Sequence, residues 1–198
     1  MDWQKTAENM KKRGFTVRRY ATGAEAAEAL CGELKGQEIG MGGSVTAAQL
    51  GLPEKLEAAG CTVYARGRSW DRKDTDKGVT APVYISSANG VAETGELVNI
   101  DGTGNRVASM IFGPKNVALI IGKNKFAETM DECMDRIKAV ACAKNARRLG
   151  LSTPCAVAGR CTDCFSKERI CSVTTIIEAK PGAISEMHLI LVDEVLGY

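Results

Sequence analysis

The chain has 198 residues, of which 44% are hydrophobic and 25% are charged, proportions typical of a soluble globular domain and not of a disordered or fibrous chain. Its formal net charge of +2 is too small to indicate a surface for nucleic acid or anionic membranes. The longest aliphatic run, Val117–Ile121, is far shorter than the roughly 20 residues that span a bilayer, and the first residues lack an apolar signal segment. We therefore expect a cytoplasmic protein that binds neither nucleic acid nor membranes.

Helix and strand patterns alternate along the chain. In chain order, the predicted elements are helix 2–13, strand 15–20, helix 22–34, strand 37–41, helix 54–59, strands 61–65, 83–86, 97–100 and 116–122, helix 125–149, and strands 173–177 and 188–192. Thr22 and Glu25 form a capping box at the start of the second helix. Residues 66–78, dense in charge and glycine, are expected to be an exposed loop or a polar helix. The alternation predicts an α/β fold with a mostly parallel sheet flanked by helices, in one domain over residues 1–198.

A glycine turn, Gly40–Thr46, joins a predicted strand to a following helix. Glycines let the backbone approach a ligand closely, and amides at a helix start favour an anion. The turn matches neither the dinucleotide fingerprint nor the P-loop. It is therefore either a tight turn capped by Ser44 or the site of an anionic small-molecule ligand. The residues that would bind that ligand are Gly42, Gly43, Ser44 and Thr46.

Small polar residues, two acids and an arginine are dense between residues 86 and 106. A β-hairpin explains part of this composition, but a hairpin does not require Glu93, Asp101 and Arg106 together. As a catalytic site, the stretch would use Glu93 or Asp101 as a general base or nucleophile, and Arg106 as a clamp for a carboxylate or phosphate. Asn89 and Thr94 would assist in ligand binding. Both interpretations, hairpin and site, stay open from the residues alone.

The eight cysteines form two groups. Four are scattered through predicted regular elements and are expected to be buried small hydrophobes: Cys31, Cys61, Cys133 and Cys142. Four share a loop at residues 150–172 and are candidate metal ligands: Cys155, Cys161, Cys164 and Cys171. Zinc and iron–sulfur clusters both accept four thiolates, and a two-residue spacer such as that between Cys161 and Cys164 suits either. Redox-active thiols, a Cys161–Cys164 disulfide and inert cysteines are the alternatives.

Several segments resemble the signature of the LUD family, the lactate-utilisation domain. They are Asn89–Ala108, Phe112–Lys115, Gly122–Lys125, Lys144–Leu149 and Leu196–Tyr198. The resemblance covers roughly residues 5–198. It is nearest to short stand-alone members that carry the cysteine loop, and lactate utilisation protein C is a more distant relative.

The resemblance implies a fold similar to that of ribose-5-phosphate isomerase, glucosamine-6-phosphate deaminase and the CoA-transferases. In that group a Gly-Ser/Thr loop binds phosphate, which matches Gly42–Thr46, and an acid at a later strand end does the chemistry, with Glu93 or Asp101 as nearest counterparts. The family implies a role in lactate or related organic-acid metabolism beside iron–sulfur partner proteins, which favours a cluster over zinc. Two alternatives are an accessory protein that binds a metal or cluster and docks to redox protein partners, and an isomerase or acyl- or CoA-transferring enzyme.

Overall fold

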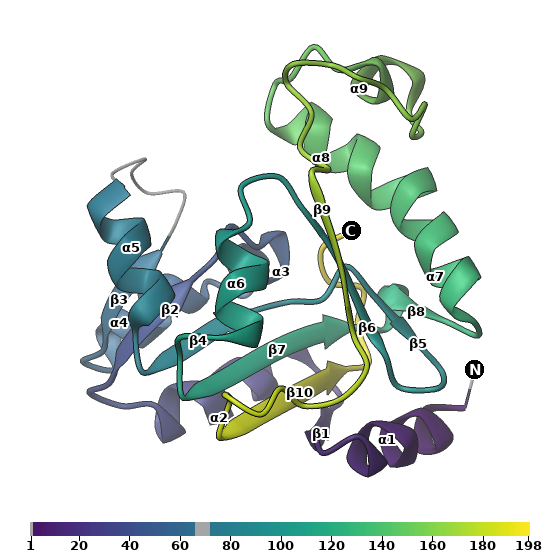
Figure 1. The fold of residues 1–198 in the computed structure, drawn as a ribbon. Helices are drawn as coiled ribbons and strands as arrows, with labels where there is room; N and C mark the ends of the chain where they lie inside the picture. The colour runs from purple at the N-terminus through teal and green to yellow at the C-terminus, as the bar shows by residue number, and fades with distance from the viewer. Residues whose placement is uncertain (1, 66–71) are drawn as a thin grey trace.

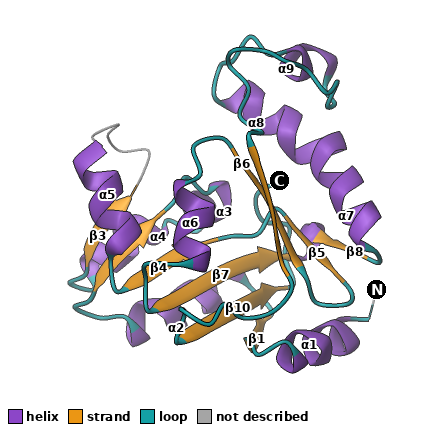
Figure 2. Cartoon of the chain, in the orientation of Figure 1, coloured by secondary structure: helices purple, strands orange, loops and turns teal. Residues whose placement is uncertain are grey.

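The structure, a computed structural model, describes residues 2–65 and 72–198. Residues 66–71, part of the stretch expected to be a loop or polar helix, lie outside the described residues, and the rest of that stretch begins helix α5. The described strands form two sheets with helices packed around them (Figures 1 and 2). No helix within the described ranges is both long and apolar enough to cross a membrane.

The larger sheet has six strands in the order β1-β10-β7-β4-β2-β3. These strands are β1 (Thr16–Tyr20), β2 (Glu38–Met41), β3 (Thr62–Ala65), β4 (Val83–Ser86), β7 (Asn116–Gly122) and β10 (Glu186–Val192). Every neighbouring pair in this sheet is parallel. The predicted α/β class with a parallel, helix-flanked sheet is therefore confirmed.

Helices pack around the strands of the described chain. They are α1 (Trp3–Lys12), α2 (Gly23–Glu33), α3 (Val45–Gln49), α4 (Leu52–Ala58), α5 (Arg72–Thr80), α6 (Asn105–Ile111), α7 (Met130–Arg136), α8 (Cys142–Arg148) and α9 (Pro154–Ala158). A π-helical turn, Ile137–Ala141, joins α7 to α8 without a break. Thr22 caps α2 through the predicted capping box with Glu25.

Strand β7 contributes to two hydrophobic cores. Ala118 and Ile120 pack with α2 and α4, whereas Val117, Leu119 and Ile121 pack on the other face with α1 and α6. Successive side chains of a strand point to opposite faces, so a strand covered on both faces needs apolar residues at every position. This explains why the most apolar run in the sequence is a central strand.

A second, smaller sheet is built from two strands between β4 and β7 in the chain and two strands after β7. Its order is β8-β5-β6-β9, from β5 (Gly90–Ala92), β6 (Leu97–Asp101), β8 (Phe126–Ala127) and β9 (Val173–Ile177). β5 and β6 form an antiparallel hairpin, so the hairpin interpretation of this stretch describes its backbone correctly. β9, expected to close the main sheet, pairs antiparallel with β6 instead.

The predicted helix 125–149 begins later than expected, at Met130. A capping box between Thr129 and Glu132 fixes that start. The preceding residues form a 3₁₀ turn, Lys123–Lys125, and the short strand β8, whose Phe126 ring packs 4.5 Å from the ring of Trp3. The amphipathic pattern predicted the helix, and local capping decided its first residue.

Candidate functional site

Three polar side chains meet where strands of the larger sheet end. Thr46 lies five residues beyond the last residue of β2 in the chain, Ser87 directly follows β4, and Lys125 lies three residues beyond β7. The Nζ of Lys125 donates to the Oγ of Ser87 at 2.7 Å and to the Oγ1 of Thr46 at 2.9 Å. Ser87 in turn donates to the carbonyl of Ile120 in β7 at 2.6 Å. The carboxyl ends of parallel strands are the usual ligand-binding edge of such sheets, and here that edge holds a lysine with two hydroxyls.

Lys125 is buried, with 4% of its surface exposed. Burial, together with the positive charges of Arg136 and Arg106, lowers its pKa from 10.5 to about 7. A lysine in such surroundings changes charge near neutral pH. It can therefore hold or release a proton under physiological conditions.

Arg136, the last residue of α7, is the second cation of this region. Its Nη2 donates to the carbonyl of Asn89 and lies 3.4 Å from the backbone oxygen of Tyr198. Its Nε is buried and has no hydrogen-bond partner within residues 2–65 and 72–198. Burial lowers the pKa of this guanidinium as well, so the energetic cost of holding its charge here is not fully offset by the described partners.

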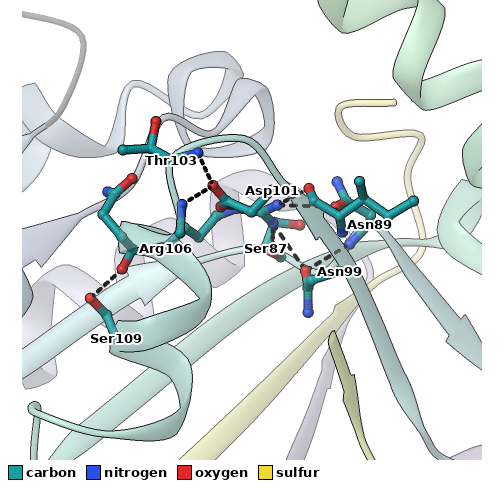
Figure 3. Close-up of polar contacts among 10 residues, drawn as sticks. Ser87, Asn89, Asn99, Asp101, Thr103, Arg106 and Ser109 are labelled. Atoms are coloured by element: carbon teal, nitrogen blue, oxygen red, sulfur yellow. Dashed lines mark hydrogen bonds and ion pairs between the residues drawn. The ribbon is translucent and has the colours of Figure 1, made fainter. Parts of the chain in front are cut away.

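Arg106, the third cation, is held at the centre of the network in Figure 3. Each of its five N–H groups donates to an oxygen of the protein. The acceptors are the Asp101 carboxylate at 3.0 Å, the side-chain oxygens of Asn89 and Asn99 at 3.0 Å each, and the carbonyls of Ser87 at 3.3 Å and Ile100 at 2.7 Å. A guanidinium has five donors and no more. Arg106 therefore positions the hairpin against β4 and has no N–H group left to bind a ligand.

Both carboxylate oxygens of Asp101 also accept hydrogen bonds from within the protein. One carboxylate oxygen accepts from Arg106, and the other accepts from the amides of Thr103 at 3.0 Å and Gly104 at 2.8 Å. These bonds shape the turn that leads into α6. In this arrangement Asp101 acts as the partner of Arg106 and as a turn-forming acceptor.

Glu93 and Thr94 lie at the opposite end of the hairpin, beside α1. Glu93 pairs with Lys5, which lowers the pKa of the carboxyl, and its carbonyl accepts from Asn9 at 3.0 Å. The Thr94 carbonyl accepts from Arg13 at 2.7 Å. The structure thus brings Thr46, Asn89, Asp101 and Arg106 together with Lys125, and it places Glu93 and Thr94 against α1.

The glycine turn, Gly40–Thr46, packs against the Arg106 network. Ser44 caps α3 by accepting from the amide of Ala47 at 3.2 Å, which is the tight-turn interpretation. A Cβ at Gly42 would lie 2.7 Å from the Tyr84 hydroxyl and 3.3 Å from the Arg106 Cγ, so only glycine leaves room there. A Cβ at Gly43 would meet nothing within 4 Å. Gly42 thus permits the placement of Arg106, and Thr46 is the turn residue that contacts Lys125.

The last residues of the chain cross over Lys125. The amide of Gly197 donates to the side chain of Gln49 at 2.7 Å. The side chain of Asn124 accepts from the amide of Leu196 and donates to the carbonyl of Gly197. Gly197 has a φ of +65°, and a Cβ there would lie 2.5 Å from Thr46 Oγ1 and 3.2 Å from Lys125 Nζ. This segment is therefore fitted closely over the Lys125 group.

The sequence patterns did not indicate Lys125 or Arg136. Both fall within the predicted helix 125–149, where charged residues are expected on the solvent face. The available signal was position: Lys125 stands three residues after the most apolar strand, at the edge where α/β sheets bind ligands.

A separate small pocket, with a cavity volume of about 20 Å³, lies among α8, α9 and the loop that follows. Five cysteines line it: Cys142, Cys155, Cys161, Cys164 and Cys171. Cys142, expected to be a buried small hydrophobe, is half-buried; it packs against a hydrophobic cluster and also lines this pocket. All five are free thiols, so the disulfide alternative is not seen. No three His, Cys, Asp or Glu side chains in the described ranges are arranged to hold a single metal ion.

Comparisons with known proteins place this chain in a family. It matches no curated protein. It is similar to the crystal structure of a DUF162 family protein from Deinococcus radiodurans, with a TM-score of 0.55 over 96% of this chain and 94% of that one, at 13% identity, which shows a shared fold. The family model of the LUD domain matches residues 3–192. The chain therefore belongs to the LUD domain family.

Proposed function

We propose that this protein binds a small organic carboxylate beside Lys125 and Arg136, at the carboxyl end of the larger sheet. Membership of the LUD family supports a role related to lactate utilisation. Lactate and the corresponding 2-oxo acid are small carboxylates of this kind. One observation carries the proposal: a buried lysine lies near two arginines, and among the described residues only Arg106 of these three cations forms an ion pair with an Asp or Glu side chain.

The charge balance favours an anion. Asp101 offsets the charge of Arg106, whereas the partners given above for Lys125 and Arg136 are hydroxyl and carbonyl oxygens. Both charged groups that shift the pKa of Lys125 are themselves positive. Buried charges cost free energy unless they are paired, so a ligand with one negative charge would stabilise this group.

The hydrogen-bond donors of Lys125 and Arg136 also favour an anionic ligand. An ammonium has three N–H donors, and Lys125 uses two of them on Thr46 and Ser87. The Nε of Arg136 is also a donor without a partner in the described chain. A carboxylate has two oxygens that accept such bonds. The glycine turn enters this proposal through Thr46, which orients the lysine.

A bound carboxylate would raise the pKa of Lys125, because an opposite charge nearby favours the ammonium form. Above about pH 7 the free protein holds this lysine mainly as the neutral amine. Binding must then include uptake of a proton. The affinity should therefore weaken as the pH rises above about 7.

Titration calorimetry with lactate, pyruvate and the neutral amide lactamide tests the proposal. Wild-type protein should bind at least one of the two carboxylates and should not bind lactamide. Lys125→Met should weaken binding at least about tenfold, equivalent to about 1.4 kcal/mol, while the exposed neighbour Lys123→Met should bind as wild type does. Equal affinity in the two variants, equal binding of the amide, or no carboxylate binding by the wild type would each overturn the proposal.

A further inference from the structure

Helices α8 and α9 and the loop that follows α9, which carry the cysteines of the cysteine-lined pocket, lie at one edge of the molecule (Figure 1). The pocket combines Cys142 from helix α8, Cys155 from α9, and three cysteines from the following loop. Five of the eight cysteines in the chain therefore converge from segments that span 30 residues of sequence. Inert cysteines have no reason to gather around one cavity, whereas a thiophilic ligand requires it.

The spacing of the thiols fits a cluster better than a single zinc ion. Zinc binds four thiolates at about 2.3 Å, which brings their sulfurs to within about 3.8 Å of one another. The described cysteines contain no such group of three. An iron–sulfur cluster places several metal and sulfide atoms between its cysteine ligands, so it needs thiols distributed around a cavity. The five cysteines that line this small pocket are distributed around it in that way.

The surroundings of the sulfurs suit thiolate ligands. The amide of Asp163 points at the Sγ of Cys161 at 3.4 Å, with Asp163 in the left-handed region at a φ of +48°. The hydroxyl of Thr153 lies 3.2 Å from the Sγ of Cys155. Hydrogen bonds to the ligand sulfurs tune such centres. The backbone here is bent in a way that provides one of them.

Arg169 shapes the loop and supplies positive charge. It donates to the carbonyls of Cys164 at 2.9 Å and Cys171 at 3.0 Å, and it lines the pocket. A cation at this position would offset the negative charge of metal-bound thiolates. The amide of Cys161 also donates to the carbonyl of Lys138 at 3.0 Å, which anchors the loop to the π turn.

We propose that this pocket binds an iron–sulfur cluster through Cys155, Cys161, Cys164 and Cys171, with Cys142 as a neighbouring thiol that is not a ligand. The four ligands belong to a short helix and a loop, whose backbone can adjust to a cluster. Cys142 is fixed within a continuous helix and lies behind them. Four thiolates complete the ligand set of common clusters, and each thiol releases its proton when it binds iron.

Anaerobic reconstitution with iron and sulfide, followed by gel filtration, tests this. The wild type should retain iron and acid-labile sulfide in equal amounts, about two or about four of each per chain, with broad absorbance near ~400 nm. Cys161→Ala/Cys164→Ala should lose both. Cys142→Ala and Cys31→Ala, which alter a pocket thiol and a thiol outside the pocket, should keep both. Far-ultraviolet circular dichroism shows that each variant is folded.

Three results would overturn the proposal. The first is a wild type that retains no more iron than the double variant. The second is one tightly bound zinc per chain after anaerobic purification, with no uptake of iron. The third is loss of the cluster in Cys142→Ala together with its retention in Cys171→Ala, which would reverse the ligand assignment.

Discussion

The Nζ of Lys125 lies 2.7 Å from the Oγ of Ser87, so the residues that follow β7 and β4 are bonded directly across the end of the sheet. These two strands are parallel neighbours. The bond draws the lysine inward, where it is almost fully buried. Its main physical consequence is a dependence of stability on pH.

We expect the ligand-free protein to become more stable as the pH rises above about 7. The folded pKa of Lys125 is about 7 and its ordinary value is 10.5. Between these values the unfolded chain binds a proton that the folded chain does not, so the free energy of unfolding increases with pH by up to about 1.4 kcal/mol per unit. Urea unfolding at pH 6.5, 7.5 and 8.5 measures this slope. Lys125→Met should reduce it and Lys123→Met should not; identical slopes in all three proteins would contradict the pKa assignment.

Replacing Arg106 with lysine should destabilise the protein by about 2–4 kcal/mol, although the charge is conserved. The guanidinium makes five hydrogen bonds to largely buried acceptors, and lysine can make three at most. Arg148→Lys is the matched control, because exposed Arg148 bonds only the Asn145 side chain among its described partners, and it should change stability by less than about 0.5 kcal/mol. Chemical denaturation compares the two. A similar small effect in both would show that the Arg106 network contributes little.

Gly197→Ala should loosen the segment that covers Lys125. Gly197 and Gly150 have nearly the same backbone, with φ of +65° and +67°, so alanine at either position costs about 1 kcal/mol from conformation alone. A Cβ at Gly150 meets nothing within 4 Å, whereas one at Gly197 would lie 2.5 Å from Thr46 Oγ1. Gly197→Ala should therefore destabilise more than Gly150→Ala in urea unfolding. Equal losses would mean that the terminal segment moves aside freely.

Glu93→Gln should leave carboxylate affinity unchanged. Glu93 faces Lys5 of α1 and makes no described contact with the Lys125 group. The substitution removes an ion pair at the hairpin turn and keeps the shape of the side chain. Calorimetry with the carboxylate that the wild type binds is the measurement. A large loss of affinity would show that Glu93 belongs to the binding site, as the sequence analysis predicted.

Local patterns predicted the elements well and their partners less well. β7 was expected at residues 116–122 and has those bounds, because a strand buried on both faces is apolar throughout. β9 was expected at residues 173–177 and has those bounds too, yet it pairs with β6 in the smaller sheet. Strand propensity depends on neighbouring residues, whereas the choice of partner depends on contacts between distant segments.

In the candidate site, too, the sequence predicted individual residues better than their partners. The sequence selected Asp101 and Arg106, and the structure does bring them together, but as partners of each other. Lys125 and Cys142 were missed because both look ordinary in a helical pattern. Their importance comes from what the fold places beside them: the hydroxyls of Thr46 and Ser87 for Lys125, and four thiols from α9 and the following loop for Cys142.

The uninterrupted helical stretch from Met130 to Arg148 physically connects the two regions. Arg136 at one end of the π turn and Cys142 at the other are six positions apart, which is about 9 Å along a helix. One continuous helix therefore carries a residue of each region, so a displacement of this helix at one region would also move a residue of the other.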